Sequence, residues 1–135
     1  MGTLIAVQEA IQSIARALPG VRSAPSQPPD SPAAYPFVVT LPAQGGLSCN
    51  NEGWFTGLHT LQTEIHVCRR DMTYDAVRLI TLLQAFYRAL MASPTLSGTV
   101  STVNDVRYYW RTMEWAGQET RGYLIQIDVK LQETS

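Results

Sequence analysis

The sequence predicts an α+β fold in which a mostly antiparallel, four-stranded sheet packs against two helices. Two segments have helical periodicity and four have strand character, in the order α-β-β-α-β-β. One long helix separates two pairs of strands, an arrangement typical of helices layered on an antiparallel sheet. The 135 residues correspond to a single domain, 1–135. A domain of this size buries about 68% of its unfolded surface.

The first predicted helix spans residues 3–18. Its apolar residues recur every three or four positions and therefore share one face: Leu4, Val7, Ile11, Ile14 and Leu18. Thr3 is placed to cap its start, and Pro19-Gly20 ends it. The second helix is predicted over residues 73–91, and its expected buried face consists of Val77, Ile80, Leu83, Phe86, Tyr87 and Leu90.

Four segments rich in β-branched and aromatic residues are predicted strands: 35–41, 58–70, 103–115 and 123–131. A proline-rich crossover, residues 23–36, precedes the first strand and is expected to run extended over the surface. Alternation divides the second strand into two sides. The buried side is expected to hold Leu61, Thr63, Ile65 and Val67, and the solvated side Gln62, Glu64 and His66.

A long loop, residues 42–57, is predicted between the first two strands. Sixteen residues without secondary structure are unusual inside a compact domain, and such loops are often functional. Its glycines and asparagines, among them Gly45, Gly46, Asn50 and Asn51, are typical of an irregular connection. Trp54 and Phe55 are expected near its tip, where such large apolar side chains either fold back onto the domain or contact a partner.

The charge and cysteine content exclude several classes of protein. The net charge is −1, so the chain lacks the basic surface expected of a nucleic-acid or anionic-membrane binder. Two cysteines do not make a disulfide framework, and a reducing compartment is the simpler expectation. The first eighteen residues carry charges within their apolar stretch and do not read as a signal peptide.

The residues that could carry chemistry do not form a recognisable site. The glycines lie between two strands, whereas a phosphate loop needs them before a helix. A zinc site would have to assemble Cys49, His59, His66 and Cys68, but the two histidines have opposite parity on one strand. A nucleophile pair of Cys68 and His66, oriented by Glu64, lacks any local signature. We therefore predict no catalytic residue, metal or cofactor.

The third strand is aromatic on both sides, which a half-exposed strand should not be. One side carries Val106, Tyr108 and Trp110, and the other carries Arg107, Tyr109, Arg111, Met113 and Trp115. Arginine, aromatic residues and methionine are enriched at protein interfaces, so the second set is our candidate subunit interface. Burial within the monomer, or a ligand pocket wall, would explain the same pattern.

Two helices cannot easily cover both faces and both edges of four strands. Uncovered edges invite pairing with another chain, and a ring of identical subunits would satisfy them through one repeated contact.

The succession of segments resembles the tail terminator proteins of long-tailed bacteriophages, also called tail completion or tail-to-head joining proteins. The resemblance covers nearly the whole chain, and most of it lies in the stretch YPFVVTLPAQGG…TLQTEIHVCRRDMTYDAVRLI. It is one of architecture and pattern rather than of a short motif.

The resemblance implies a hexameric ring, without cofactor or catalytic residues, that caps the finished tail tube and offers a surface to the head–tail connector. Residues 43–57 would be the tube-facing segment. DNA would pass through the lumen without specific binding, and the protein would belong to the tail–neck region of the virion after assembly in the host cytoplasm. The alternatives are a neck head-completion or adaptor protein, a small Cys/His-dependent hydrolase or metal-binding enzyme, and a ligand-binding module.

Overall fold

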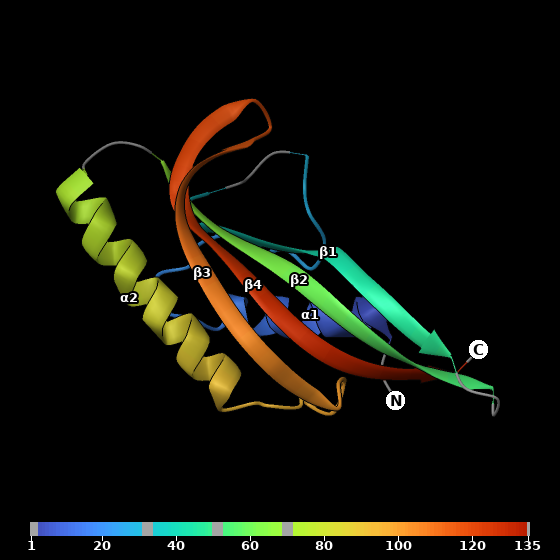
Figure 1. Ribbon diagram of the computed structural model, residues 1–135. Helices are drawn as coiled ribbons and strands as arrows, with labels where there is room; N and C mark the ends of the chain where they lie inside the picture. Colours follow the sequence, from blue (N-terminus) through green and yellow to red (C-terminus); the bar gives the residue numbers. More distant parts are fainter. Residues whose placement is uncertain (1–2, 31–33, 50–52, 69–71, 135) are drawn as a thin grey trace.

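The computed structural model describes residues 3–30, 34–49, 53–68 and 72–134, and it confirms the predicted order of elements (Figure 1). The elements are α1 (Leu4–Arg16), β1 (Phe37–Cys49), β2 (Trp54–Cys68), α2 (Met72–Met91), β3 (Thr102–Trp115) and β4 (Gln118–Thr134). All neighbouring strands are antiparallel, in the order β1-β2-β4-β3. The two edges of the sheet are therefore β1 and β3.

Both helices pack on the same face of the sheet, which we call the helix face. Figure 1 shows α1 behind the strands of the sheet and α2 lying beside β3, and the strand that α1 contacts most is β1. A single core cluster joins the helices to alternate strand residues, namely Val38 of β1, Leu61 and Ile65 of β2, and Ile125, Ile127, Val129 and Leu131 of β4. Neither helix covers the opposite face, which we call the open face.

Helix α1 begins as predicted and ends two residues earlier than expected. The Thr3 hydroxyl accepts a hydrogen bond from the backbone N–H of Ala6 at 3.3 Å, and the helix ends at Arg16. Two glutamines on its buried side, Gln8 and Gln12, are 3% and 0% exposed. Burying an amide costs free energy unless it is hydrogen-bonded, and both side chains bond to backbone carbonyl groups of β1 and the crossover.

The predicted buried face of α2 is wrong at two positions. Val77 and Ile80 are 64% and 54% exposed, whereas the buried residues are Leu79, Leu82, Leu83, Phe86 and Leu90. The helix contains two apolar stripes, and both fit a period of 3.6 residues. Only the packing against α1, β2 and β4 selects between them, so the second stripe is left facing outward.

The predicted loop 42–57 is also wrong, because β1 continues to Cys49 and β2 begins at Trp54. Gly45, Gly46 and Leu47 pair in register with residues of β2. A register shift between Pro42 and Gln44 is the only irregularity within the described part of this hairpin. β4 pairs with β2 as far as Trp54, so the extension has strand support on its inner side. Glycine favours a loop by its sequence propensity, but pairing with β2 holds Gly45 and Gly46 in an extended strand.

The turn between β3 and β4 is tight. Only Ala116 and Gly117 separate β3 from β4, with φ values of 54° and 78°. Positive φ at both central residues is the geometry of a type I′ hairpin turn, whose twist matches that of the strands. This hairpin is strongly curved in Figure 1. The curvature accompanies the packing of Trp115 against Phe37 of β1, with ring centroids 5.7 Å apart on the open face.

Prediction for Gly122. A Cβ at this residue of β4 would lie 1.6 Å from the backbone oxygen of Ile65, whereas a Cβ at Gly46 would have no neighbour within 4 Å. We expect Gly122→Ala to lower the free energy of unfolding by about 3 kcal/mol or more, because the backbone of two paired strands must separate. Gly46→Ala is the matched control and should unfold like the wild type. Urea denaturation measures both, and equal midpoints for the two variants would contradict the close packing at Gly122.

Candidate functional site

The extended β1–β2 hairpin is the first candidate surface. Every residue from Leu41 to Cys49 is exposed, as is Leu58 opposite Gly46. Trp54 and Phe55, predicted near a loop tip, instead begin β2 and are partly buried. Asn50 and Asn51 lie outside the described residues. Of the six predicted tube-facing residues, the structure therefore places four on one projecting end of the sheet.

The glycines of this hairpin make room for His59. A Cβ on Gly45 would lie 2.6 Å from Nδ1 of His59, and a Cβ on Gly57 would lie 2.3 Å from its Nε2. The imidazole is 12% exposed, and its Nε2 is 3.9 Å from Oε2 of Glu133 on β4. The two small residues thus allow a buried ring to fill the helix face of the hairpin, where neither helix reaches.

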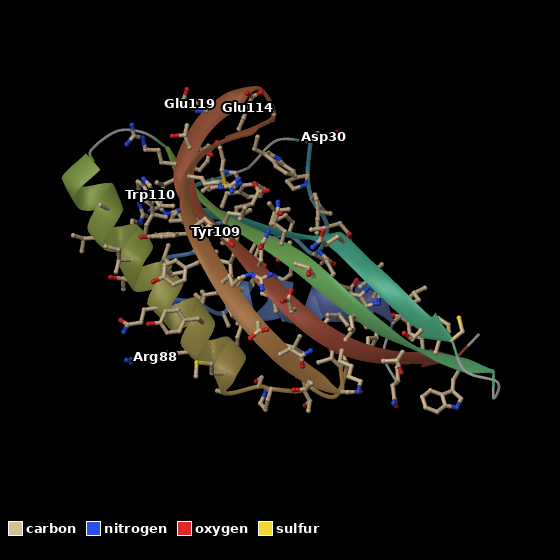
Figure 2. All side chains as sticks on the ribbon, in the orientation of Figure 1. Asp30, Arg88, Tyr109, Trp110, Glu114 and Glu119 are labelled. Atoms are coloured by element: carbon tan, nitrogen blue, oxygen red, sulfur yellow. The ribbon has the colours of Figure 1, made fainter. Side chains whose placement is uncertain are left out.

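The second candidate surface is the edge strand β3. On its helix face, Tyr108 and Trp110 are 55% and 44% exposed and contact Tyr123 of β4 edge-to-face, with centroids 5.8 and 5.3 Å apart. Burial, together with the charge of Tyr108, raises the pKa of the Tyr123 phenol. Figure 2 shows Trp110 beside β3 on the side toward α2. Tyr108, Trp110 and Tyr123 therefore form a row of contacting aromatic rings that is partly exposed to solvent.

The open face of β3 carries arginine beside tyrosine. Arg107 donates two hydrogen bonds to the carboxylate of Asp128, at 2.9 and 3.3 Å, and the bond and charge of Asp128 raise the pKa of Arg107. Asp128 also accepts a hydrogen bond from Thr60 at 2.6 Å. Arg111 lies over the ring of Tyr109, 5.5 Å from its centroid. These contacts hold the three β3 side chains in place while they stay exposed.

Two predicted interface residues are less available than the others. Met113 and Trp115 are only partly exposed. The Trp115 indole N–H donates a hydrogen bond to the carbonyl oxygen of Pro29 in the crossover at 3.1 Å. Trp115 is therefore used in packing within the subunit, and Arg107, Tyr109 and Arg111 remain the stronger interface candidates.

His66 is buried, so its predicted place on a solvated side is wrong. It is 0% exposed, because Phe37 and Trp115 stack beside it where the curved hairpin meets the open face. Its Nε2 lies 2.8 Å from Oε1 of Glu64, and its Nδ1 bonds to the hydroxyl of Thr120. A carboxylate only accepts, so Nε2 carries a proton, and in the neutral ring Nδ1 accepts from Thr120.

Glu64, His66 and Thr120 follow the order carboxylate, imidazole and hydroxyl of a hydrolase triad. Unlike in such a triad, the hydroxyl is not accessible to a substrate. The hydroxyl belongs to Thr120, which is 0% exposed like His66, so the group that would attack a substrate does not reach the surface. The hydroxyl of Thr120 bonds to Nδ1 of the imidazole, and the side chain of Cys68, the other predicted member of the pair, lies outside the part of the chain that is described. In this geometry the side chains of Glu64, His66 and Thr120 join β2 to β4 as a structural hydrogen-bond network.

Apolar surface flanks both edges on the helix face. Beside β3, a hollow of about 390 Å³ is lined mainly by the end of α2 and the start of β3, including Met91 and Val106. Beside β1, Ile5 and Leu41 line a hollow of about 250 Å³. Sequence reasoning missed Val77 and Ile80 as surface residues, because a periodic pattern does not reveal which of two stripes faces the core. Ile5 lies outside the predicted buried face of the first helix, and it is exposed.

The described residues were searched for grouped metal ligands and for membrane-spanning helices. Within these residues, no three side chains of His, Cys, Asp or Glu are placed to hold a metal ion. Among the described helices, none has the length and hydropathy needed to cross a bilayer.

No protein-family model matches the sequence, and no curated protein is significantly similar to it.

Prediction for Thr120. Thr120→Val keeps the shape of the side chain but leaves Nδ1 of His66 buried without a donor. We expect the free energy of unfolding to fall by about 1–3 kcal/mol, the usual cost of a buried unsatisfied group. Thr112→Val, at an exposed position of β3, is the matched control and should change stability little. Chemical denaturation at neutral pH compares the two, and equal stabilities would show that the His66 network contributes nothing.

Proposed function

We propose that this protein is a phage tail terminator, which forms a hexameric ring, caps the tail tube, stops its polymerisation and offers the attachment surface for the head–tail connector. The proposal combines the resemblance of the sequence with the arrangement of exposed surfaces. It assigns the protein a structural role in the neck region of the virion, without an enzymatic reaction or a cofactor.

One observation carries the proposal: within the described residues, each edge of the sheet is open over a long stretch, and the two open stretches are chemically different. The β1 edge offers glycines and small uncharged residues beside Ile5 and Leu41. The β3 edge offers tyrosine, tryptophan and arginine beside the outer stripe of α2. A two-fold contact would use only one edge and leave the other bare. A head-to-tail contact uses both, and such contacts close into rings when the rotation allows.

The projecting hairpin supports the second part of the proposal, binding to the tube. The hairpin end of β1 and β2 extends the sheet beyond the helices (Figure 1) and exposes Leu47 and Leu58. In a ring, six copies of this end would lie on one side. Many modest contacts would add up there, because each bound subunit raises the effective concentration of the next. The far side of the ring would lack this end, so tube growth would stop.

The lumen of such a ring must let DNA pass without holding it. The net charge of −1 and the pairing of Arg107 with Asp128 are compatible with a lining of mixed charge. A ring with a strongly basic lining would retain DNA through its phosphates.

Prediction for the projecting end. We expect the double variant Trp54→Ala/Phe55→Ala to fold and form rings but to cap tubes poorly, because it loses large apolar contacts with the tube. Electron microscopy of tails assembled with the variant should show tubes longer than normal. Arg88→Ala, an exposed change on α2, is the control and should leave tail length normal.

The oligomer is measured separately by sedimentation or native mass spectrometry, where we expect six subunits of 14.9 kDa each. Tails of normal length with the double variant would contradict the docking assignment. A ring that binds connectors but leaves tail length unaffected would instead favour the neck adaptor. A monomer with hydrolytic activity would favour the enzyme.

A further inference from the structure

The outer edge of β1 is closed in its first part and open in its second. The Gln12 and Gln8 amides donate to the carbonyl oxygens of Val38 and Thr40, at 3.1 and 3.0 Å. The backbone N–H of Val38 donates to the carbonyl of Ser23 at 2.8 Å. From Leu41 to Cys49 no such partner lies outside the strand within the described residues, and all nine residues are exposed. We call this stretch, 41–49, the open β1 segment.

The outer edge of β3 is open along nearly its whole length. The N–H of Val103 donates to the carbonyl of Pro94 at 2.9 Å, but in the described chain no strand pairs with residues 104–114 on that side. Natural proteins protect such edges with proline, lysine or very short strands. The stretch 104–114 is long and contains neither proline nor lysine. We call it the open β3 segment.

The two segments are complementary in size, and their charges do not repel each other. The open β1 segment, LPAQGGLSC, carries no charged side chain and has glycine at 45 and 46. The open β3 segment carries Tyr108, Tyr109 and Trp110 between two arginines. An aromatic residue beside a glycine on a neighbouring strand covers the exposed backbone and stabilises the pair. Space is available at Gly46, because a Cβ there would have no neighbour within 4 Å.

Pairing of two identical β3 edges is less favourable. An antiparallel pair centred on Tyr109 would place Arg107 of each copy opposite Arg111 of the other, and like charges directly opposite destabilise a sheet. It would also leave both open β1 segments bare. The occupant of each edge is therefore the opposite edge of a second copy.

We propose that the open β3 segment of one subunit pairs through backbone hydrogen bonds with the open β1 segment of the next, so that the sheet continues across the subunit boundary. Tyr108, Tyr109 and Trp110 then cover the neighbour's Gly45 and Gly46. This inference rests on the proposed head-to-tail ring and adds the strands and residues that form its contact. It does not require that the ring caps a tube.

Disulfide trapping tests the pairing directly, because a disulfide forms only when two Cβ atoms lie about 4 Å apart. In a Cys49→Ser/Cys68→Ser background, one protein carries Gly46→Cys and a second carries Tyr108→Cys, Tyr109→Cys or Trp110→Cys. We expect at least one mixture to form cross-linked dimers under mild oxidation, while each variant alone does not. Cross-linking of a β3 variant with itself would overturn the proposal, as would mixtures that never cross-link.

A charge at the contact gives an independent test. Gly46→Lys adds no clash within the subunit, but it places a cation against Arg107 and Arg111 of the next copy. We expect the association constant, measured by sedimentation, to fall at least about tenfold, with unchanged thermal unfolding of the isolated subunit. Ser13→Lys, at an exposed position of α1, adds the same charge and should associate normally. Normal association of Gly46→Lys would contradict the pairing.

The outcomes separate this inference from the proposed function. Cross-links without tube capping would leave the strand pairing intact and remove the terminator role. Tube capping by a ring that shows no cross-link would keep the function and remove the pairing. A chain that stays monomeric at tens of micromolar, without cross-links, would overturn both.

Discussion

The surface chemistry of this protein follows from a mismatch in length between its helices and its strands. At ~1.5 Å per residue, the 20 residues of α2 span ~30 Å and the 13 of α1 ~20 Å. At ~3.3 Å per residue, the 15 residues of β2 span ~50 Å. The helices therefore cover the middle of one face and leave the hairpin end uncovered. The projecting hairpin end, which carries the proposed tube contact, lies on sheet that they do not reach.

Neither helix covers the open face, but at the curved end of the sheet other elements pack over it. At the curved end, the β3–β4 hairpin brings Trp115 over Phe37 and His66, and the crossover accepts the indole hydrogen bond at Pro29. A buried imidazole is stable there because both of its nitrogens have partners, Glu64 and Thr120. The hydrogen bonds among Glu64, His66 and Thr120 therefore belong to the packing of this end of the sheet. This leaves the exposed edges as the features that a subunit alone does not account for.

The sequence predicted the element types and their order, because long periodic segments such as residues 123–131 leave little ambiguity. Prediction from the sequence failed where one pattern fitted two arrangements, or where tertiary contacts determined the conformation or burial of a residue. Both stripes of α2 are helical, and only its docking buries Leu79 instead of Ile80. Gly45 and Gly46 favour a loop by propensity, but pairing with β2 makes them a strand. His66 alternates with core residues, and only the curled hairpin buries it. Arg107, Tyr109 and Arg111 share one exposed side of β3, as their alternation predicts, and their role at an interface stays a prediction.

The packing of the His59 ring against Gly45 and Gly57 has a consequence for how the sequence evolves. The imidazole occupies the volume that side chains at Gly45 and Gly57 would need, and all three residues belong to the same face of the hairpin. A larger residue at either glycine is tolerated only if position 59 shrinks, and a smaller residue at 59 leaves a void between two strands. The three positions are therefore expected to covary among homologous sequences. Where one of them has a larger side chain, another should have a smaller one, so that their summed side-chain volume stays nearly constant.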